Sequence, residues 1–305
     1  SLPELRLDDD KGSVSARDSA NEILVTGPGF RIRFSKLDGL IHSYQVKGTE
    51  LIKKGYELKP NFWRPPTDND FGANFQNLLL NWKRVSSDYG LLDYKIDRSR
   101  AGEVALQMTY DLPDVYAGLT IGYRIDGSGA MIVSETLHAD TTHKVPMLPK
   151  FGMQMMLPKS FSRMQWYGRG PGESYWDRKD AEFVGLYQGD VHDQVHPYLR
   201  PQETGNKSDV RWMKLTDASG KGIMITSDTV LNLTARHFLD KDLDDGLEKH
   251  NRHSGELKER DMTVLSIDLQ QMGLGGINSW SEWPLPQYRL DYHDYSYQFK
   301  IIPLP

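Results

Sequence analysis

Apolar and polar residues alternate in segments spread along this chain, and the alternation constrains its fold more than any other feature. Successive side chains of a β-strand point to opposite faces, so a period of two residues predicts a half-buried strand. The clearest alternating segments are residues 30–34, 106–110, 119–125, 265–269 and 295–301. The glycine-containing sequences D-G-S-G at 126–129 and S-G-K-G at 219–222 predict hairpin turns. The strands are therefore expected to be antiparallel.

Helical patterning is rare in the sequence. Only residues 74–85 predict a helix, with Leu78, Leu79 and Trp82 on one side. Strands and helices do not alternate regularly, which argues against a parallel barrel or a doubly wound sheet. No repeat, low-complexity tract or flexible linker divides the 305 residues. We therefore expect one all-β domain, a large antiparallel sandwich with few short helices.

The composition indicates a soluble globular protein, since 38% of the residues are hydrophobic and 26% are charged. A net charge of −5 gives no reason to expect nucleic acid or an anionic membrane as a partner. No apolar run approaches the ~20 residues that span a bilayer, and no signal peptide is visible. The chain has no cysteine, which excludes disulfides, thiol catalysis and thiolate metal sites. Because it starts on serine, we expect an excised or processed piece of unknown localisation.

The segment 61–72, N-F-W-R-P-P-T-D-N-D-F-G, is the most informative motif. Proline fixes φ, so Pro65-Pro66 holds this backbone in place before any ligand binds. The following Asp68-Asn69-Asp70 sequence predicts a tight turn. Fixed polar groups beside Phe62 and Trp63 suit a site for a polyhydroxylated ligand. The alternative is a turn with a buried aromatic anchor, because most Asp/Asn/Pro clusters are only turns.

A second motif lies at residues 166–178, W-Y-G-R-G-P-G-E-S-Y-W-D-R. Its three glycines predict an irregular path that lets the backbone approach a ligand closely. Glu173, Asp177 and Arg178 are candidate partners for sugar hydroxyls. The alternative is a glycine-rich crossover with a structural Glu/Arg pair.

A third motif, residues 196–212, places polar side chains between Tyr198 and Trp212. These polar residues are Gln202, Glu203, Asn206, Asp209 and Arg211. So many polar groups beside aromatic rings predict a polar network in a cleft, although an exposed loop would look similar.

A fourth motif, M-G-L-G-G-I-N-S-W at 272–280, begins like a dinucleotide-binding loop. Asn278 occupies the place of the third glycine and no helix is predicted afterwards, so this interpretation fails. We instead expect a glycine-rich loop at the end of a strand. This loop presents Trp280 and is followed by Trp283. A tryptophan on a loop can stack against the C–H face of a sugar, although a solitary tryptophan is more often part of a core.

Metal sites are weakly indicated. The first, third and fifth positions of a calcium loop are matched by Asp240, Asp242 and Asp244. However, Asp245 replaces the required glycine and Asn251 replaces the closing glutamate. His250 and His253 could ligate a metal only from a helix, so we favour a charged, solvated loop and predict no metal site. Catalytic carboxylates cannot be selected from 42 acidic residues, because a retaining glycosidase needs two carboxyl groups roughly 5–5.5 Å apart.

Taken together, the motifs resemble successive blocks of one known domain. The five matching blocks, in chain order, are F-W-R-P-P-T-D-N-D-F-G (62–72), Y-R-I-D-G-S-G (123–129), Y-G-R-G-P-G-E-S-Y-W-D-R (167–178), P-Y-L-R-P-Q-E-T-G-N (197–206) and M-G-L-G-G-I-N-S-W (272–280). This order resembles the C-terminal small-chain domain, domain 5, of β-galactosidases of glycoside hydrolase family two. The resemblance covers nearly the whole chain.

The resemblance implies a galactose-mutarotase-like antiparallel β-supersandwich. It implies one domain over residues 1–305, with 1–20 as an extended lead-in from a preceding domain. The parent enzyme would hydrolyse terminal β-galactosides with retention, using glutamates of an upstream (β/α)8 barrel. This chain would pack on that barrel and complete one wall of the galactoside pocket, but would not be catalytic alone. Parent enzymes are often homo-oligomers and often need Mg²⁺ and Na⁺ bound mainly by other domains, and no cofactor is predicted in this chain.

The resemblance also assigns roles to single residues. Trp280 matches a tryptophan that stacks on the substrate, and Glu203, Asn206 and Arg178 are further substrate-binding candidates. Gly72, with Ala73 and Asn74 after it, matches a mobile loop in which the glycine would act as a hinge. The chain departs from some relatives at Ile277-Asn278, which replaces an acidic pair, and in the shorter loop after Gly72.

Two other functions remain open on the sequence. A stand-alone aldose epimerase of the same fold needs a general acid and base, and His192, His196 and Glu203 fall in one polar region. A free-standing carbohydrate-binding module would use Trp280 and Trp283 without any partner domain. The sequence also leaves open a related specificity, such as β-glucuronide or β-mannoside.

Overall fold

The computed structural model describes residues 2, 4–8, 11–276, 278 and 280–304. The strands within these residues are β1 (Ser15–Asp18), β2 (Glu22–Gly27), β3 (Phe30–Ser35), β4 (Ile41–Val46), β5 (Thr49–Glu50), β6 (Leu58–Asn61), β7 (Gly90–Asp97), β8 (Glu103–Leu112), β9 (Ala117–Asp126), β10 (Met131–Ala139), β11 (Lys150–Leu157), β12 (Arg163–Gly170), β13 (Phe183–Asp190), β14 (Lys207–Thr216), β15 (Gly222–Arg236), β16 (Thr263–Gln271) and β17 (Tyr295–Leu304). The helices are α1 (Asp68–Gly72), α2 (Phe75–Leu78), α3 (Leu80–Val85) and α4 (Asp240–Leu243), with 3-10 turns η1 (Pro113–Val115), η2 (Val191–Gln194), η3 (Ser254–Glu256) and η4 (Pro286–Tyr288).

The strands pair into one continuous antiparallel sheet that folds over on itself. The path of pairing runs β7–β8–β9–β10–β17–β15–β16–β11–β6–β4–β3–β2–β1. Strands β14, β12 and β13 branch from β15, and β13 is paired only with β12 among the described strands. The prediction of an all-β antiparallel fold with few short helices is therefore confirmed.

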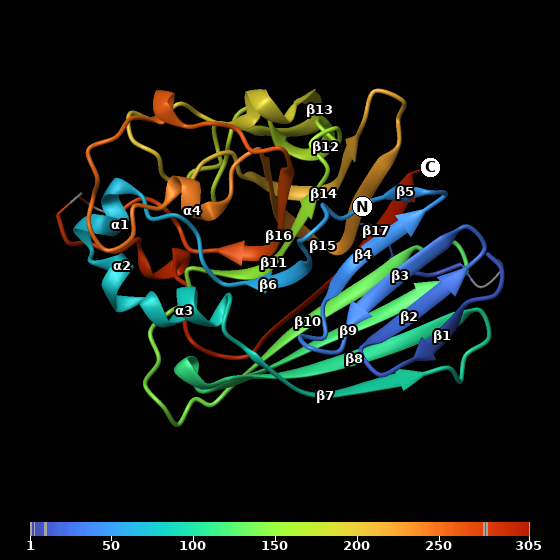
Figure 1. The fold of residues 1–305 in the computed structure, drawn as a ribbon. Helices are drawn as coiled ribbons and strands as arrows, with labels where there is room; N and C mark the ends of the chain where they lie inside the picture. Colours follow the sequence, from blue (N-terminus) through green and yellow to red (C-terminus); the bar gives the residue numbers. More distant parts are fainter. Residues whose placement is uncertain (1, 3, 9–10, 277, 279, 305) are drawn as a thin grey trace.

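Strands β2–β4 lie across β8–β10 and enclose a core between the two layers (Figure 1). The rings of Phe34 on β3 and Tyr123 on β9 meet edge-to-face with centroids 4.9 Å apart. The Tyr44 hydroxyl on β4 donates to the carbonyl of Gly129 in the β9–β10 turn. Most buried apolar side chains belong to one contiguous cluster, so this chain supplies its own hydrophobic core.

The predicted alternation is confirmed in strands that face the core on one side only. In β3, Phe30, Ile32 and Phe34 are buried while the arginines between them are exposed. The alternating interpretation of 265–269 is wrong, because the first six residues of β16 are all buried. Strand β16 lies between β11 and β15, and both of its faces are covered. The predicted hairpins are confirmed as the turns between β9 and β10 and between β14 and β15.

The predicted helix at 74–85 is confirmed as two short helices, α2 and α3. Leu79 and Trp82 are buried, but Leu78 is 54% exposed, so its assignment to the buried side is wrong. The predicted turn at 68–70 is also wrong, because these residues form the first turn of α1. Thr67 caps this helix, and its Oγ1 accepts from the Asp70 amide at 3.2 Å.

The irregular path predicted for the second motif begins only after Gly170, and the third glycine, Gly172, lies in a bend there. Gly168 and Gly170 lie within the regular strand β12. A Cβ at Gly168 would lie 2.9 Å from Val210, so this glycine allows close packing inside the protein. Within the expected lead-in 1–20, residues 15–18 form β1 and pair with β2. In the part of the chain that the structure describes, no helix is long and apolar enough to cross a bilayer.

Candidate functional site

The four sequence motifs meet at one cleft beside helix α1. The cleft has a volume of about 190 Å³. It is lined by residues of the first motif (Thr67, Asp68, Asn69), the second (Arg178), the third (Tyr198, Gln202, Glu203) and the fourth (Leu274). The predicted substrate-binding residues Arg178 and Glu203 therefore lie on the same cleft.

Helix α1 forms one wall and is fixed from below by a buried ion pair. Arg64 Nη1 and Nη2 donate to the two carboxylate oxygens of Asp70 at 2.5 and 3.1 Å. Both side chains are almost fully buried. Arg64 Nη2 also donates to the carbonyl of Gly273 at 3.3 Å, which ties the first motif to the fourth. The proline pair directly after Arg64 limits the backbone conformations of this segment.

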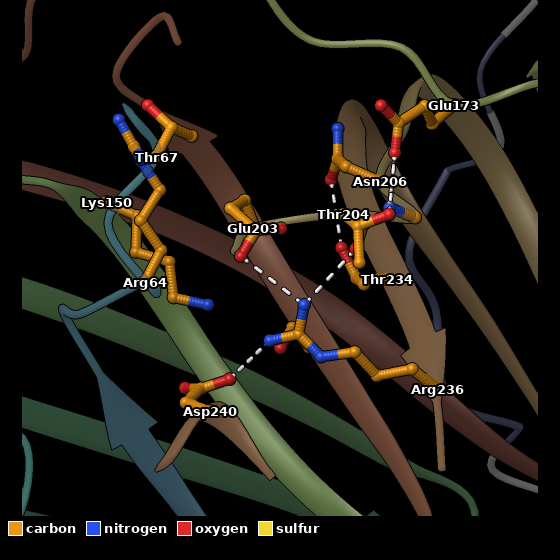
Figure 2. Close-up of polar contacts among 12 residues, drawn as sticks. Arg64, Thr67, Lys150, Glu173, Glu203, Thr204, Asn206, Thr234, Arg236 and Asp240 are labelled. Carbon is orange, nitrogen blue, oxygen red and sulfur yellow. Dashed lines mark hydrogen bonds and ion pairs between the residues drawn. The ribbon is translucent and has the colours of Figure 1, made fainter. Parts of the chain in front are cut away.

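Beneath the cleft, Arg236 joins the buried carboxylate of Glu203 to the partly exposed carboxylate of Asp240 (Figure 2). Its Nη1 lies 3.4 Å from Glu203 Oε2, and its Nη2 lies 2.5 Å from Asp240 Oδ1. The Tyr175 hydroxyl donates to the other oxygen of Glu203 at 3.2 Å. Burial acts to raise the pKa of Asp240, but the charge of Arg236 outweighs it and the pKa is lowered. Glu203 thus reaches the cleft from a fixed ionic network.

The rim of the cleft is held by Glu173. Arg178 Nη2 donates to Glu173 Oε1 at 2.7 Å and to the Tyr198 hydroxyl at 2.8 Å. The other oxygen of Glu173 accepts from Thr204 Oγ1 at 3.0 Å and from the Gly205 amide at 2.8 Å. Burial and the adjacent Glu173 carboxylate raise the pKa of Tyr198 to about 12, so this phenol keeps its proton. Both carboxylate oxygens of Glu173 therefore accept hydrogen bonds within the protein. Glu173 holds the rim in place and is not a free ligand contact.

Two of the predicted polar residues make their contacts inside the protein. Asp177 accepts from the amides of Leu274 and Gly275 at 3.1 and 2.7 Å, so it shapes the glycine-rich loop. Asn206 is fully buried, and its carboxamide contacts the Ser174 carbonyl at 2.7 Å, Asn232 at 3.3 Å and Thr234 at 3.2 Å. Asn206 supports the cleft but is not one of the residues that line it.

Trp280 projects from the loop that follows the cleft residue Leu274. Its side chain is 82% exposed, which is unusual for the largest apolar side chain. Its amide donates to Asn278 Oδ1 at 2.9 Å. Trp283, in contrast, is half-buried and packs 6.4 Å from the ring of Phe75. Ile277, named above as a departure from some relatives, lies outside the described residues.

The expected mobile loop connects two helices. Gly72 is the last residue of α1, and the Ala73 amide donates to the Asn69 carbonyl at 3.0 Å. Asn74 adopts the left-handed conformation, with φ of 61°, and is the N-cap residue directly before α2. Motion of this connection stays a prediction.

The weaker sequence candidates have partners elsewhere. Asp242 pairs with Arg260 at 2.6 Å, and Asp244 pairs with Lys83 at 2.7 Å. His192 pairs with Glu259 at 2.5 Å on the surface, whereas Glu203 pairs with Arg236 inside. Two of the three residues proposed for epimerase chemistry, His192 and Glu203, thus have separate partners. Among the described residues, no three histidine or acidic side chains form a group that could hold a metal ion.

The sequence did not reveal the buried charges that support the site. Arg236 and the pair Lys150–Asp268, 3.2 Å apart, were not singled out. A charged residue within a strand pattern is usually solvated, and the partners of these side chains lie far away in sequence. The capping box of Thr67 and Asp70 was a readable local signal that was missed.

The fold and the cleft define an all-β sandwich domain with a polar surface site. The sequence model described as β-galactosidase small chain matches residues 26–301, so the chain belongs to this family. A β-galactosidase of Priestia megaterium is 34% identical over 294 residues, covering 96% of this chain and 27% of that relative. A β-galactosidase of Lactobacillus delbrueckii subsp. bulgaricus is 34% identical over 292 residues, covering 95% and 27%. The chain thus spans about a quarter of the length of these relatives.

Two solved structures resemble the overall arrangement at low sequence identity. Galactose 1-epimerase from Lactobacillus acidophilus NCFM has a TM-score of 0.48 and 8% identity, and the match covers 100% of both chains. A galactose mutarotase related enzyme from Lactobacillus acidophilus has a TM-score of 0.49 and 7% identity, covering 93% of this chain and 97% of the other. These likenesses concern the fold alone.

Proposed function

We propose that this chain is domain 5 of a β-galactosidase of glycoside hydrolase family two. In this proposal it packs on a catalytic barrel of the same polypeptide and completes the wall of a galactoside pocket. Membership of the small-chain family and the 27% coverage of relatives named β-galactosidase support a role as part of a larger enzyme. The observation that carries the proposal is the meeting of four separate sequence motifs at one cleft.

The cleft has the dimensions of half a pocket. Its volume of about 190 Å³ lies below the roughly 300–1,000 Å³ of small-molecule sites. A second protein surface over the cleft would enclose a sugar more fully. The exposed indole of Trp280 would then stack on one face of the sugar, and desolvation between two domains would strengthen that contact.

The polar residues of the cleft have complementary roles in this proposal. Arg178 uses one of its three nitrogens for Glu173 and Tyr198, which leaves N–H donors for sugar hydroxyls. Glu203 offers carboxylate oxygens that are already fixed by Arg236. Asn206 is assigned a supporting role, because its carboxamide ties the third motif to its neighbours.

We assign the chemistry to the barrel and not to this chain. Retaining hydrolysis needs a carboxylate nucleophile and a second carboxyl group that donates a proton. Glu203 and Glu173 are each held by an arginine and a tyrosine hydroxyl. Burial acts to raise the pKa of Asp68, but Lys249 and Arg200 outweigh it, and the lowered pKa does not suit a general acid. The isolated chain is therefore expected to be inactive, and the parent enzyme to hydrolyse terminal β-galactosides with retention.

Proton NMR of freshly dissolved α-lactose tests this assignment. One sample contains the 305-residue chain, a second the full-length polypeptide, and a third the heat-denatured chain as control. We expect cleavage only in the second sample, and anomer interconversion in the first at the rate of the control. Rapid anomer interconversion in the first sample would instead support the aldose epimerase. Cleavage by the chain alone would show that its own carboxylates are catalytic.

A further inference from the structure

A second and larger cavity lies away from the cleft, between the segment leading into β6, helix α3 and helix α4. Its volume is about 440 Å³, within the roughly 300–1,000 Å³ of small-molecule sites. It shares no lining residue with the cleft described above. The side chains that decide its chemistry are Tyr56, Trp63, Lys83, Met156, Asp240 and Asp244.

One side of this cavity is apolar. Met156 and Leu239 are buried there, and the half-buried Tyr56 packs against the same small hydrophobic cluster. Trp63 is only 4% exposed, so little of its ring is available to a ligand. Tyr56 therefore offers the aromatic surface on which an apolar face of a ligand can lie.

Two carboxylates among the lining residues are held in place by protein donors. Asp240 Oδ2 accepts from Asn61 at 2.9 Å and Gln154 at 3.2 Å, and its Oδ1 accepts from Arg236. An ionised carboxylate has about four acceptor positions, so Asp240 retains one for a ligand hydroxyl. Its orientation does not depend on the ligand, because three protein donors fix it.

Asp244 is fixed in the same way. Its Oδ2 accepts from Trp63 Nε1 at 2.8 Å and from Lys83 Nζ at 2.7 Å. Its Oδ1 accepts from the Gly246 amide at 2.7 Å. Its side chain is only 2% exposed, so Asp244 holds Trp63 and Lys83 in place and is not itself a ligand contact.

The charges that line the cavity balance. Lys59, Lys83 and Lys241 oppose Glu57, Asp240 and Asp244. Among the described residues, no ion pair or hydrogen bond involves the side chains of Lys59, Lys241 or Glu57, so two donors and one acceptor of the cavity lining remain for a ligand. A balanced set of charges favours a neutral ligand over an anion or a cation.

We propose that this cavity is a second carbohydrate-binding site that takes a neutral mono- or disaccharide. Tyr56 stacks on the sugar, and the more exposed Asp240 accepts a hydroxyl. This site is separate from the cleft of the proposed function and does not depend on it.

The test uses methionine methyl NMR, because Met156 lines the cavity and reports on it directly. The 305-residue chain carries ¹³C-methyl methionine, and the Met156 resonance is assigned through Met156→Leu. Lactose and galactose are titrated to about 100 mM, and we expect a saturable Met156 shift with a Kd on the order of 1–10 mM. Met164, which lies in β12 outside this cavity, serves as an internal control and should not shift.

Three variants determine whether the Met156 shift arises from sugar bound in this cavity. Tyr56→Ala should weaken the apparent affinity about tenfold or more, whereas Tyr56→Phe should retain it. Arg178→Ala, in the cleft of the proposed function, should leave the Met156 titration unchanged. The proposal is overturned if Met156 shows no saturable shift, or if the shift persists in a folded Tyr56→Ala chain. If Tyr56→Ala does not fold, the wild-type titration and Lys241→Met, which removes a donor from the cavity lining and is expected to weaken binding, decide the matter.

Discussion

At the scale of single residues, the site depends on charges that the fold has removed from water. Arg236 is 2% exposed, and its two carboxylate partners reach it from the third motif and from helix α4. Removing one member of a buried ion network leaves the others uncompensated, which costs more than the network contributes by itself. Arg236 therefore controls both the shape and the stability of the cleft floor.

Arg236→Met should lower the free energy of unfolding by about 3–5 kcal/mol, measured by urea denaturation. Arg33→Met is the matched control, because Arg33 is half-exposed and 3.9 Å from Glu22, and it should cost less than about 1 kcal/mol. Combining Arg236→Met with Glu203→Gln and Asp240→Asn should recover part of the loss. Equal losses in Arg236→Met and Arg33→Met would contradict this account.

Asp268 provides a prediction on pH. It is fully buried beside Lys150, and burial raises its pKa to about 7. A raised pKa means that the folded state prefers the protonated carboxyl. The stability from this group is therefore fully present below its unfolded pKa of about 4 and is lost as the pH rises through about 7.

The measurement compares urea unfolding of the wild type and Asp268→Asn between pH 4 and pH 8. The stability of the wild type relative to the variant should fall across this range, by on the order of 4 kcal/mol if the shift is fully expressed. The difference should then become constant above pH 8. A difference that is independent of pH would show that Asp268 titrates normally.

The residue scale is also where sequence reasoning was least informative. Arg236 and Glu203 are 33 residues apart, and Lys150 and Asp268 are 118 residues apart. Nothing local distinguishes such partners from ordinary surface charges, because the fold alone brings them together. Glu203 and Arg178 were singled out only because they lie in segments dense in polar and aromatic residues.

At the scale of elements, the first wall of the cleft depends on the start of α1. The Thr67 side chain caps the helix, and the Asp70 carboxylate accepts from the Thr67 amide at 2.8 Å. This reciprocal capping box satisfies amides that would otherwise lack partners. Asp68 and Asn69, the next two residues, line the cleft.

Thr67→Ala should therefore destabilise the protein by about 1 kcal/mol and increase hydrogen exchange of the α1 amides. Thr67→Ser keeps the capping oxygen and should lose much less. Thermal unfolding and amide exchange of both variants decide the matter. Equal effects of alanine and serine would mean that the methyl group, and not the cap, stabilises α1.

The sequence predicted those strands in which one side is buried in the core and the other side is exposed or less buried. The alternation of 119–125 identified β9, whose apolar residues alternate with less buried ones. In β11 all eight residues are buried, and no alternation marked this strand. In β16 the alternation of apolar residues with Ser266 and Asp268 marked the strand, but both of these residues are buried, so the expected exposed face was wrong. Continuous burial carries no period of two, and the sequence does not distinguish the two faces.

At the scale of the whole molecule, the chain is a self-contained sandwich that forms part of a longer protein in its relatives. The order of motifs along the sequence predicted the family, and the fold explains why they are linked. Each motif supplies one side of a single cleft. The residues alone left open whether Trp280 is presented on a loop or belongs to a core, and the family resemblance favoured the exposed position, in which it is 82% exposed.

The most direct test of the account is the steady-state kinetics of Trp280→Ala in the full-length polypeptide with lactose. Trp280→Phe retains part of the stacking surface, and Leu37→Ala is a control at an equally exposed position far along the chain, 89% exposed. The account predicts that kcat/KM falls about tenfold in Trp280→Ala, mostly through KM, and less in Trp280→Phe. Thermal stability should be unchanged in all three variants. Kinetics of Trp280→Ala that match the wild type would contradict the account.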